Sequence, residues 1–162
     1  MRTVGLLLVA LIFCLVSSVV FADDQEDILT VIKEYSTHQA TGDIAKQKEM
    51  MTADRTFVTG GRRLTDQVLN MQGQQAAQDR NRKRDPGAQV FVHAVDPIVK
   101  VYGDAASASF YWHINTIWSA EFLDRAQGNP PPGWGSLVVT MVLAKENGVW
   151  KIAHTHLSPT NN

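Results

Sequence analysis

The stretch "GVWKIAHTHLSP", Gly148 to Pro159, gives the main indication of the fold of this chain. Its residues alternate as in a β-strand, where successive side chains point to opposite faces of the sheet. One face would carry Trp150, Ile152, His154 and His156, and the other Lys151, Ala153, Thr155 and Leu157. The alternation therefore predicts that both imidazoles project together, on the same side of the sheet as the tryptophan.

Strand-like sequence also fills the region before this stretch. Residues 88–103, 106–123 and 135–157 are rich in β-branched and aromatic residues, and the dipeptides Gly103-Asp104 and Asn147-Gly148 mark hairpin turns between strands. Between the last two hairpins lies a loop, residues 126–135, stiffened by three consecutive prolines. We expect Trp134 in this loop either to pack onto the sheet edge or to narrow the mouth of a pocket.

Helical patterns occupy the amino-terminal half. In residues 23–41, Ile28, Ile32 and Tyr35 recur at helical spacing behind an acidic first turn, which predicts an amphipathic helix. Gly42 is suited to end this helix, and Asp43 can cap a second, shorter helix that runs to about residue 51.

After the second helix the spacing of the apolar residues changes from a helical to a strand-like period. Gly60-Gly61 predicts a tight turn in a two-stranded ribbon, and Thr65 or Asp66 can cap a third helix that residues 85–87, "DPG", stop. Helices that precede long antiparallel strands indicate an α+β fold in one domain, residues 23–162.

Residues 1–22 resemble a secretory signal peptide, with Arg2 before an apolar run and the small residue Ala22 at its end. We expect a mature protein that begins at Asp23 and is secreted or periplasmic, without the single cysteine, Cys14. An uncleaved anchor is the alternative, because the apolar run is close to the length of a membrane-spanning helix. With 15 basic and 16 acidic residues, the composition gives no indication of nucleic-acid binding or of membrane binding after cleavage.

The order of the elements resembles the SnoaL-like branch of the nuclear transport factor 2 (NTF2)-like superfamily: a helix, "TGD", a short helix, "ADRTFVTGGRRLT", a third helix and a meander ending in "NGVWKIAHTHLSP". The segments "VHAVDPIVKVYGDAASASF" and "VWKIAHTHLSP" are also similar to the association domain of calcium/calmodulin-dependent kinase II. The resemblance implies a cone, in which a strongly curved antiparallel sheet wraps around the N-terminal helices. It also implies a cavity at the open end and homodimers formed through the sheet.

The same resemblance places Tyr35 where ketosteroid isomerases of the superfamily have the tyrosine that polarises the substrate carbonyl. The place of their proton-transferring aspartate is taken by Thr59, which is no base near neutral pH. Proton abstraction of that kind is therefore not expected unless a histidine supplies the base. The fold alone fixes no activity.

Which residues line the pocket depends on which face of each strand points inward. With the Trp150 face inward, Trp150, His154 and His156 would border the cavity together with Tyr35. The neighbouring strand adds one of two alternating sets, either Tyr111, His113 and Asn115 or Phe110, Trp112 and Ile114. Arg62, beside Arg63 after the glycine turn, is a candidate for an acidic group of a ligand at the rim.

Two functions remain open at this point. In the first, the cavity binds a small, partly apolar molecule, or the domain is a dimeric assembly module without chemistry. In the second, the chain is an enzyme of the isomerase, cyclase or hydrolase type, with His154 or His113 as general acid/base and Tyr35 as hydrogen-bond donor. A zinc site would need a third ligand such as His113 or His93 beside the His154-His156 pair, so we expect neither a metal nor another cofactor.

Overall fold

The computed structural model describes residues 23–160, so the predicted signal peptide lies outside the described residues. Residues 23–41 form the first helix, whose side chains Ile28, Ile32 and Tyr35 are buried as their spacing predicts. After Gly42, with φ +70°, the short helix α2 (Ile44–Glu49) begins at Asp43, whose side chain accepts a hydrogen bond from Lys46 N at 3.1 Å. The predicted helical hairpin is confirmed.

A ribbon and the third helix follow. Strands β1 (Met51–Thr59) and β2 (Arg62–Leu64) pair antiparallel across Gly60-Gly61, and both glycines have positive φ, +54° and +73°. Helix α3 (Gln67–Arg84) is capped by Asp66, which accepts from Leu69 N at 3.0 Å, and it ends at Asp85. The turn and both limits of the helix agree with the sequence signals.

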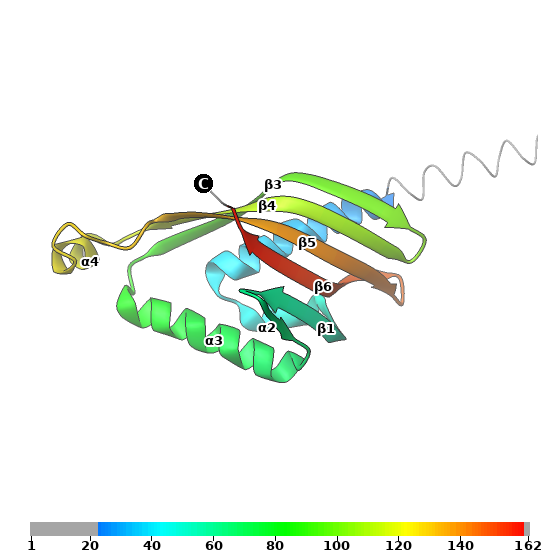
Figure 1. Ribbon diagram of the computed structural model, residues 1–162, viewed down its shortest axis with the longest axis horizontal. Coiled ribbons are helices and arrows are strands. Elements are labelled where there is room, and N and C mark those ends of the chain that lie inside the picture. Colours follow the sequence, from blue (N-terminus) through cyan, green and yellow to red (C-terminus); the bar gives the residue numbers. More distant parts are fainter. Residues whose placement is uncertain (1–22, 161–162) are drawn as a thin grey trace, which may run out of the picture.

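Four long strands complete the sheet: β3 (Gln89–Tyr102), β4 (Ala105–Ile117), β5 (Trp134–Glu146) and β6 (Val149–Pro159). The strand order is β2-β1-β6-β5-β4-β3, and each neighbouring pair is antiparallel except β1 and β6, which are parallel. The sheet curves around the first helix, and α3 lies across its lower edge in Figure 1. This is the predicted α+β cone.

One element differs from the prediction. The strand-like run 106–123 does not continue to its end, because residues 120–125 form the short helix α4 (Ala120–Arg125). Ser119 starts this helix by accepting a hydrogen bond from Phe122 N at 3.1 Å. An N-cap serine followed by Ala and Glu favours a helical turn, and this local signal outweighs the apolar residues that suggested a strand.

The proline-rich loop returns the chain from α4 to β5. Pro131 O accepts a hydrogen bond from Trp118 Nε1 at 3.1 Å, and Gly133 O accepts one from Thr116 N at 2.6 Å. Trp134 remains 53% exposed, with its ring 6.4 Å from that of His113. Trp134 does not line the cavity at the open end, whereas Trp118, which precedes α4, does.

The core fills the concave side of the sheet, between the strands and the first helix. Its largest members come from the first helix, β4, β5 and β6: Ile28, Ile32, Tyr35, Phe110, Trp112, Met141, Leu143, Trp150 and Ile152. No helix within residues 23–160 is both long and apolar enough to cross a membrane.

Candidate functional site

A β-bulge in β6 reverses the expected orientation of the last histidines. Val142 on β5 lies opposite His154, but the next residue, Leu143, lies opposite Ile152, so Ala153 is an extra residue on β6. After the bulge, the side chain that points into the core is that of Thr155, which lies opposite Met141 and is fully buried. His154 and His156 consequently face outward, on the convex side of the sheet. The prediction that they share the face of Trp150 is wrong, because an inserted residue shifts the alternation by one.

Trp150 points inward, but it does not border the cavity at the open end of the cone, where the sequence analysis had placed it. Its indole Nε1 donates to Asp24 Oδ1 at 3.1 Å, and Asp24 also forms an ion pair with Lys145. The hydrogen bond from Lys145, together with that from Trp150, lowers the pKa of Asp24 although burial opposes the shift. Trp150 thus anchors the start of the first helix to β5 and β6.

The outward face of the sheet also carries Tyr111 and His113. Tyr111 is 47% exposed, and His113 lies opposite His93 on β3, while the alternate residue Trp112 is buried at 3% exposure. Of the two sets that the sequence left open, the Phe110-Trp112-Ile114 set therefore faces the interior. Tyr35 lies on the opposite side of the sheet from His113 and His154, so these groups cannot act on one substrate as acid/base and hydrogen-bond donor.

His154 and His156 are two residues apart on β6 and lie on its outward face. Partial burial, followed by the positive charges of His156 and Arg55, lowers the pKa of His154. Among the residues that the structure describes, no three His, Cys, Asp or Glu side chains are grouped closely enough to hold a metal ion.

Inside the cone, Tyr35 belongs to a stack of aromatic and polar groups. Its ring stacks on that of Trp112 with centroids 5.7 Å apart, and Trp112 Nε1 donates to Ser36 Oγ at 2.9 Å. Burial raises the pKa of the Tyr35 hydroxyl. Tyr35 is therefore buried as a neutral hydroxyl, and it is not among the residues that line the cavity at the open end of the cone.

Arg55 is the interior residue that the sequence analysis missed. Its side chain is fully buried, with Nη2 3.4 Å from Tyr35 Oη, Nη1 3.3 Å from Met51 Sδ, and the guanidinium 4.8 Å from the centroid of the Phe57 ring. Burial lowers its pKa, and within residues 23–160 no carboxylate lies within ion-pair distance. The signal was present in β1, because Arg55 and Phe57 are two apart and therefore share a face of the strand.

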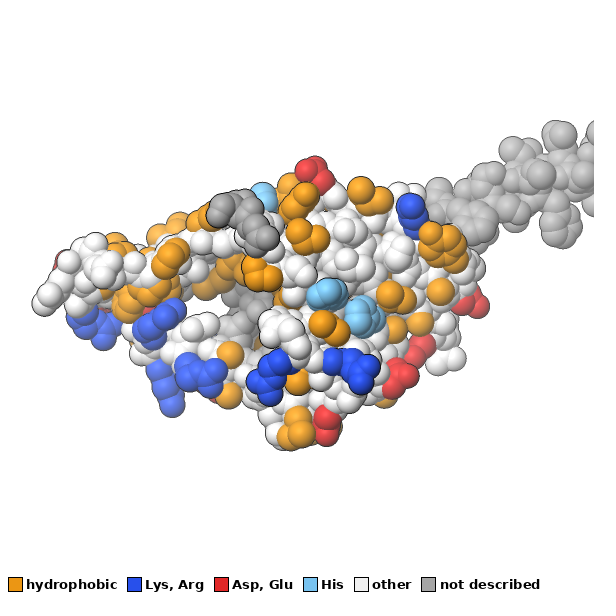
Figure 2. Space-filling model, in the orientation of Figure 1, with side chains coloured by type: hydrophobic (Ala, Val, Ile, Leu, Met, Phe, Trp, Pro, Cys, Tyr) orange, Lys and Arg blue, Asp and Glu red, His pale blue; other side chains and the backbone are white. Residues whose placement is uncertain are grey.

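A cavity of about 720 Å³ lies at the open end of the cone, between the end of the first helix, α3, β3 and β4. Figure 2 shows the surface hollowed between α3 and the far ends of the long strands. The apolar part of the lining is Ala40, Pro86, Ala88, Val90, Val92, Ile114 and Trp118, and the polar part is Gln39, Thr41, Gln78, Asn81, Arg82, Arg84, Asp85 and Thr116.

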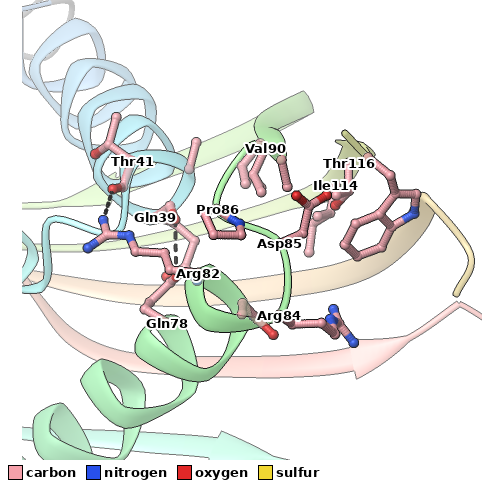
Figure 3. A pocket seen from close by; sticks show the side chains of 15 residues that line it. Gln39, Thr41, Gln78, Arg82, Arg84, Asp85, Pro86, Val90, Ile114 and Thr116 are labelled. Atoms are coloured by element: carbon pink, nitrogen blue, oxygen red, sulfur yellow. Dashed lines mark hydrogen bonds between the residues drawn. The ribbon is translucent and has the colours of Figure 1, made fainter. Parts of the chain in front are cut away.

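Two hydrogen bonds tie α3 to the first helix at the back of this cavity (Figure 3). Arg82 Nη2 donates to Thr41 O at 2.6 Å, and Gln78 Nε2 donates to Gln39 O at 3.3 Å. Both side chains bond to backbone carbonyls, and no carboxylate of residues 23–160 lies within ion-pair distance of Arg82 in the cavity wall.

The front wall is built around Asp85 and Trp118. Asp85 accepts hydrogen bonds from Ser119 Oγ at 2.6 Å, from Ser119 N at 2.8 Å and from Gly87 N at 3.1 Å. Burial raises the pKa of Asp85, but these hydrogen bonds lower it overall. The guanidinium of Arg84 lies 4.9 Å from the ring centroid of Trp118, and both side chains belong to the lining.

A second concavity, the hairpin cleft, lies between α3 and the β1–β2 ribbon and measures about 560 Å³. Arg62 and Arg63 are exposed at its lip, while Phe57 and Asn70 form part of its inner wall. Arg62 is therefore on the rim of a concavity, but a different one from the cavity at the open end. The two concavities share no lining residue.

Comparison with known proteins adds a family and a fold. A family model described as SnoaL-like domain matches residues 21–156. A comparison with functionally curated proteins found no match.

Several solved structures have the same fold. An NTF2-like protein with a cystatin-like fold from Novosphingobium aromaticivorans has a TM-score of 0.70 at 16% identity, covering 91% of this chain and 89% of that one. A candidate dehydratase of the NTF2-like family from Streptomyces avermitilis has a TM-score of 0.67 at 18% identity, covering 87% and 99%. A candidate calcium/calmodulin-dependent protein kinase II association domain from Xanthomonas campestris has a TM-score of 0.60 at 12% identity, covering 83% and 86%. Identities this low establish the fold alone.

Proposed function

The chain belongs to the SnoaL-like domain family, and on that premise we propose that it binds a small, partly apolar organic molecule in the cavity at the open end of the cone. The observation that carries this proposal is the cavity itself. Its volume of about 720 Å³ falls in the range of small-molecule sites, which are concave, mainly apolar and furnished with a few polar groups.

The lining indicates what such a molecule would offer. Val90, Val92 and Ile114 would contact an apolar body, and Trp118 would contact a flat one. Arg82 and Arg84 supply donors and positive charge at the wall, so a carbonyl, hydroxyl or acidic substituent would be favoured there.

Binding is favoured over proton transfer at this cavity. Asp85 is the acid in its lining, and its three hydrogen bonds hold its pKa low, which makes it a weak base near neutral pH. His154 and His113, the general acid/base candidates of the sequence analysis, lie on the other side of the sheet.

A blocked cavity tests the proposal. Val90 is in the lining, and V90W would place an indole there, whereas Q89W adds the same ring to the opposite face of β3 as a matched control. Native mass spectrometry of freshly purified protein should show a retained small molecule with the wild type and with Q89W, but not with V90W. A molecule retained equally by all three proteins would place binding elsewhere.

We also propose that the chain forms a homodimer through the convex face of the sheet. This face exposes Ile98 at 64%, Tyr111 at 47%, Val142 at 39% and Val138 at 36%, and an exposed apolar patch of that kind favours association. Light scattering should give a dimer mass for the wild type and a monomer mass for Y111K. An unchanged mass in Y111K would argue against this interface.

Export is proposed from the leader sequence. Cleavage after Ala22 would keep Asp24, whose ion pair with Lys145 and hydrogen bond from Trp150 join the first helix to the sheet. Amino-terminal sequencing of the protein from its native host should therefore begin at Asp23. A start at Met1 in a membrane fraction would instead indicate an anchor.

A further inference from the structure

Arg55 is an uncompensated charge in the interior of the cone. A guanidinium stays protonated even when buried, and a buried charge is costly unless an opposite charge and hydrogen bonds compensate it. Arg55 is fully buried, and its described partners are a hydroxyl and a thioether. Its Nε has no acceptor among the described residues. A carboxylate is the group whose geometry and charge this side chain matches best.

Other buried polar atoms on the elements that pack near Arg55 also lack partners within the described residues: the acceptor Gln67 Oε1, and Asn70 Nδ2 and Thr155 Oγ1, which can donate. Gln67 donates to the same sulfur atom, Met51 Sδ, at 3.1 Å, which places α3 next to Arg55. Asn70 lies one turn further on the same face of α3, and its Nδ2 has no acceptor within the described part of the chain. On the other side, Thr155 is opposite Phe57 in the β1–β6 pair, and its Oγ1 is likewise unpaired.

These groups are buried donors without acceptors on elements that contact one another, α3 with β1 and β1 with β6. Arg55 Nε, Asn70 Nδ2 and the Thr155 hydroxyl can all donate to oxygen, and they come from three different elements, β1, α3 and β6. Buried polar atoms are paired in most proteins, so several unpaired donors around a buried cation are the arrangement expected of a site for an anion.

The hairpin cleft borders the surroundings of Arg55 through Phe57, whose ring lies against the guanidinium and also lines the cleft. Asn70 belongs to the inner wall of the cleft, and Leu69 and Ala77 add apolar surface. Arg62 and Arg63 lie at its lip together with one acid, Asp66, which leaves the lip positive by one charge, and Figure 2 shows basic side chains along the edge formed by α3 and the ribbon. Positive charge at a cleft mouth attracts anions.

We propose that Arg55 anchors the carboxylate of a small organic acid with an apolar body, which enters through the hairpin cleft and receives further hydrogen bonds from Asn70 and Thr155. This site is separate from the cavity at the open end and does not depend on the function proposed there.

Benzoate is a suitable probe, with benzamide as the neutral analogue and sodium chloride at equal ionic strength as the salt control. Benzoate should raise the Tm of the full chain in a saturable way, beyond both controls. In R55M the affinity for benzoate should fall by about 10- to 100-fold, as expected for losing hydrogen bonds to a charged group. The Tm of R55M without ligand should exceed that of the wild type, because an apolar side chain replaces an uncompensated charge.

Three further variants keep the test decisive. R55K retains the charge without the planar fork and should bind benzoate more weakly than the wild type. Gly73 lines the hairpin cleft and a Cβ added there meets no atom within 4 Å, so G73F would place a ring at the cleft, whereas Gln72 is not in the lining and Q72F adds the ring outside it. G73F should lose benzoate binding and Q72F should keep it.

Several results would overturn the proposal. The first is a wild-type rise in Tm with benzoate that is no larger than the rise with benzamide or chloride. The second is an R55M protein that binds benzoate as tightly as the wild type. The third is an R55M protein that is less stable than the wild type or fails to fold, which would give Arg55 a purely structural role. If V90W abolished benzoate binding while G73F kept it, the acid would bind in the open-end cavity. That result would refute the Arg55 site and leave the proposed function standing.

Discussion

Replacing Thr155 by valine tests the orientation of β6 through its effect on stability. Thr155 is fully buried opposite Met141, and its hydroxyl has no partner among the described residues. Valine has nearly the same shape, so the substitution removes a buried polar atom without opening a cavity. We therefore expect T155V to stabilise the domain.

The size of the gain follows from the cost of burying an unpaired hydroxyl. Mutational data put this cost at about 1–3 kcal/mol, and relaxation around the native hydroxyl reduces what is recovered, so we expect a gain of about 1–2 kcal/mol. For a domain of this size the gain corresponds to a rise in Tm of about 3–8 °C. Urea unfolding followed by tryptophan fluorescence measures it, and an unchanged m-value shows that the compactness of both states is preserved.

His156→Val is the matched variant on the neighbouring position. His156 is exposed on the convex face, so H156V should change the free energy of unfolding by less than about 0.5 kcal/mol. Plain alternation without the bulge predicts the reverse pattern, with a large effect at residue 156 and a small one at residue 155. That reverse pattern would refute the orientation of β6 described above.

Three predictions concern titratable groups. The Lys145 hydrogen bond holds the pKa of Asp24 below 3.8, so its stabilisation is present above that pH and is lost as the pH falls through the folded-state pKa. D24N should therefore be less stable at pH 7 and less acid-sensitive, as urea unfolding at several pH values would show. Burial holds the pKa of His154 below 6.5, so the wild type should lose stability as the pH falls below 6.5. H154Q should lose less stability over the same range. Equal slopes of the free energy of unfolding against pH in the two proteins would contradict this. D85A removes the acceptor of the Ser119 hydrogen bonds and should lower the Tm in thermal unfolding by circular dichroism; an unchanged Tm would show that these bonds contribute nothing.

The elements of the fold could be predicted where a short-range signal specifies them. Gly60-Gly61 supplies the positive φ values of a tight turn, and Asp43 and Asp66 cap the helices that follow them. Such signals act within a few residues, so sequence alone is enough to recognise them. The SnoaL-like resemblance supplied the arrangement of these elements, which local signals do not contain.

The bulge at Ala153 has no comparable signal. Nothing in "KIAHTH" distinguishes a regular strand from one that carries an extra residue, because this bulge needs no glycine. It follows from the register that β6 must keep with β5 and with β1 at the same time. A single inserted residue therefore moved His154 and His156 from the expected pocket to the outer face.

Arg55 was missed for a different reason. A charged residue in a strand is normally assigned to the solvent face, and Asp54 and Arg55 are adjacent in the sequence, so one of them had to point inward. Only the tertiary structure shows that the inward residue is the arginine, packed on Phe57 and beside Tyr35.

The position of β6 between β1 and β5 has a consequence for synthesis on the ribosome. This strand is the last in the sequence, yet it joins the early ribbon to the later meander. A nascent chain that ends at β5 holds two separate pieces of sheet, each with an unsatisfied edge. A premature stop codon before Val149 should therefore yield an aggregating fragment rather than a smaller folded domain.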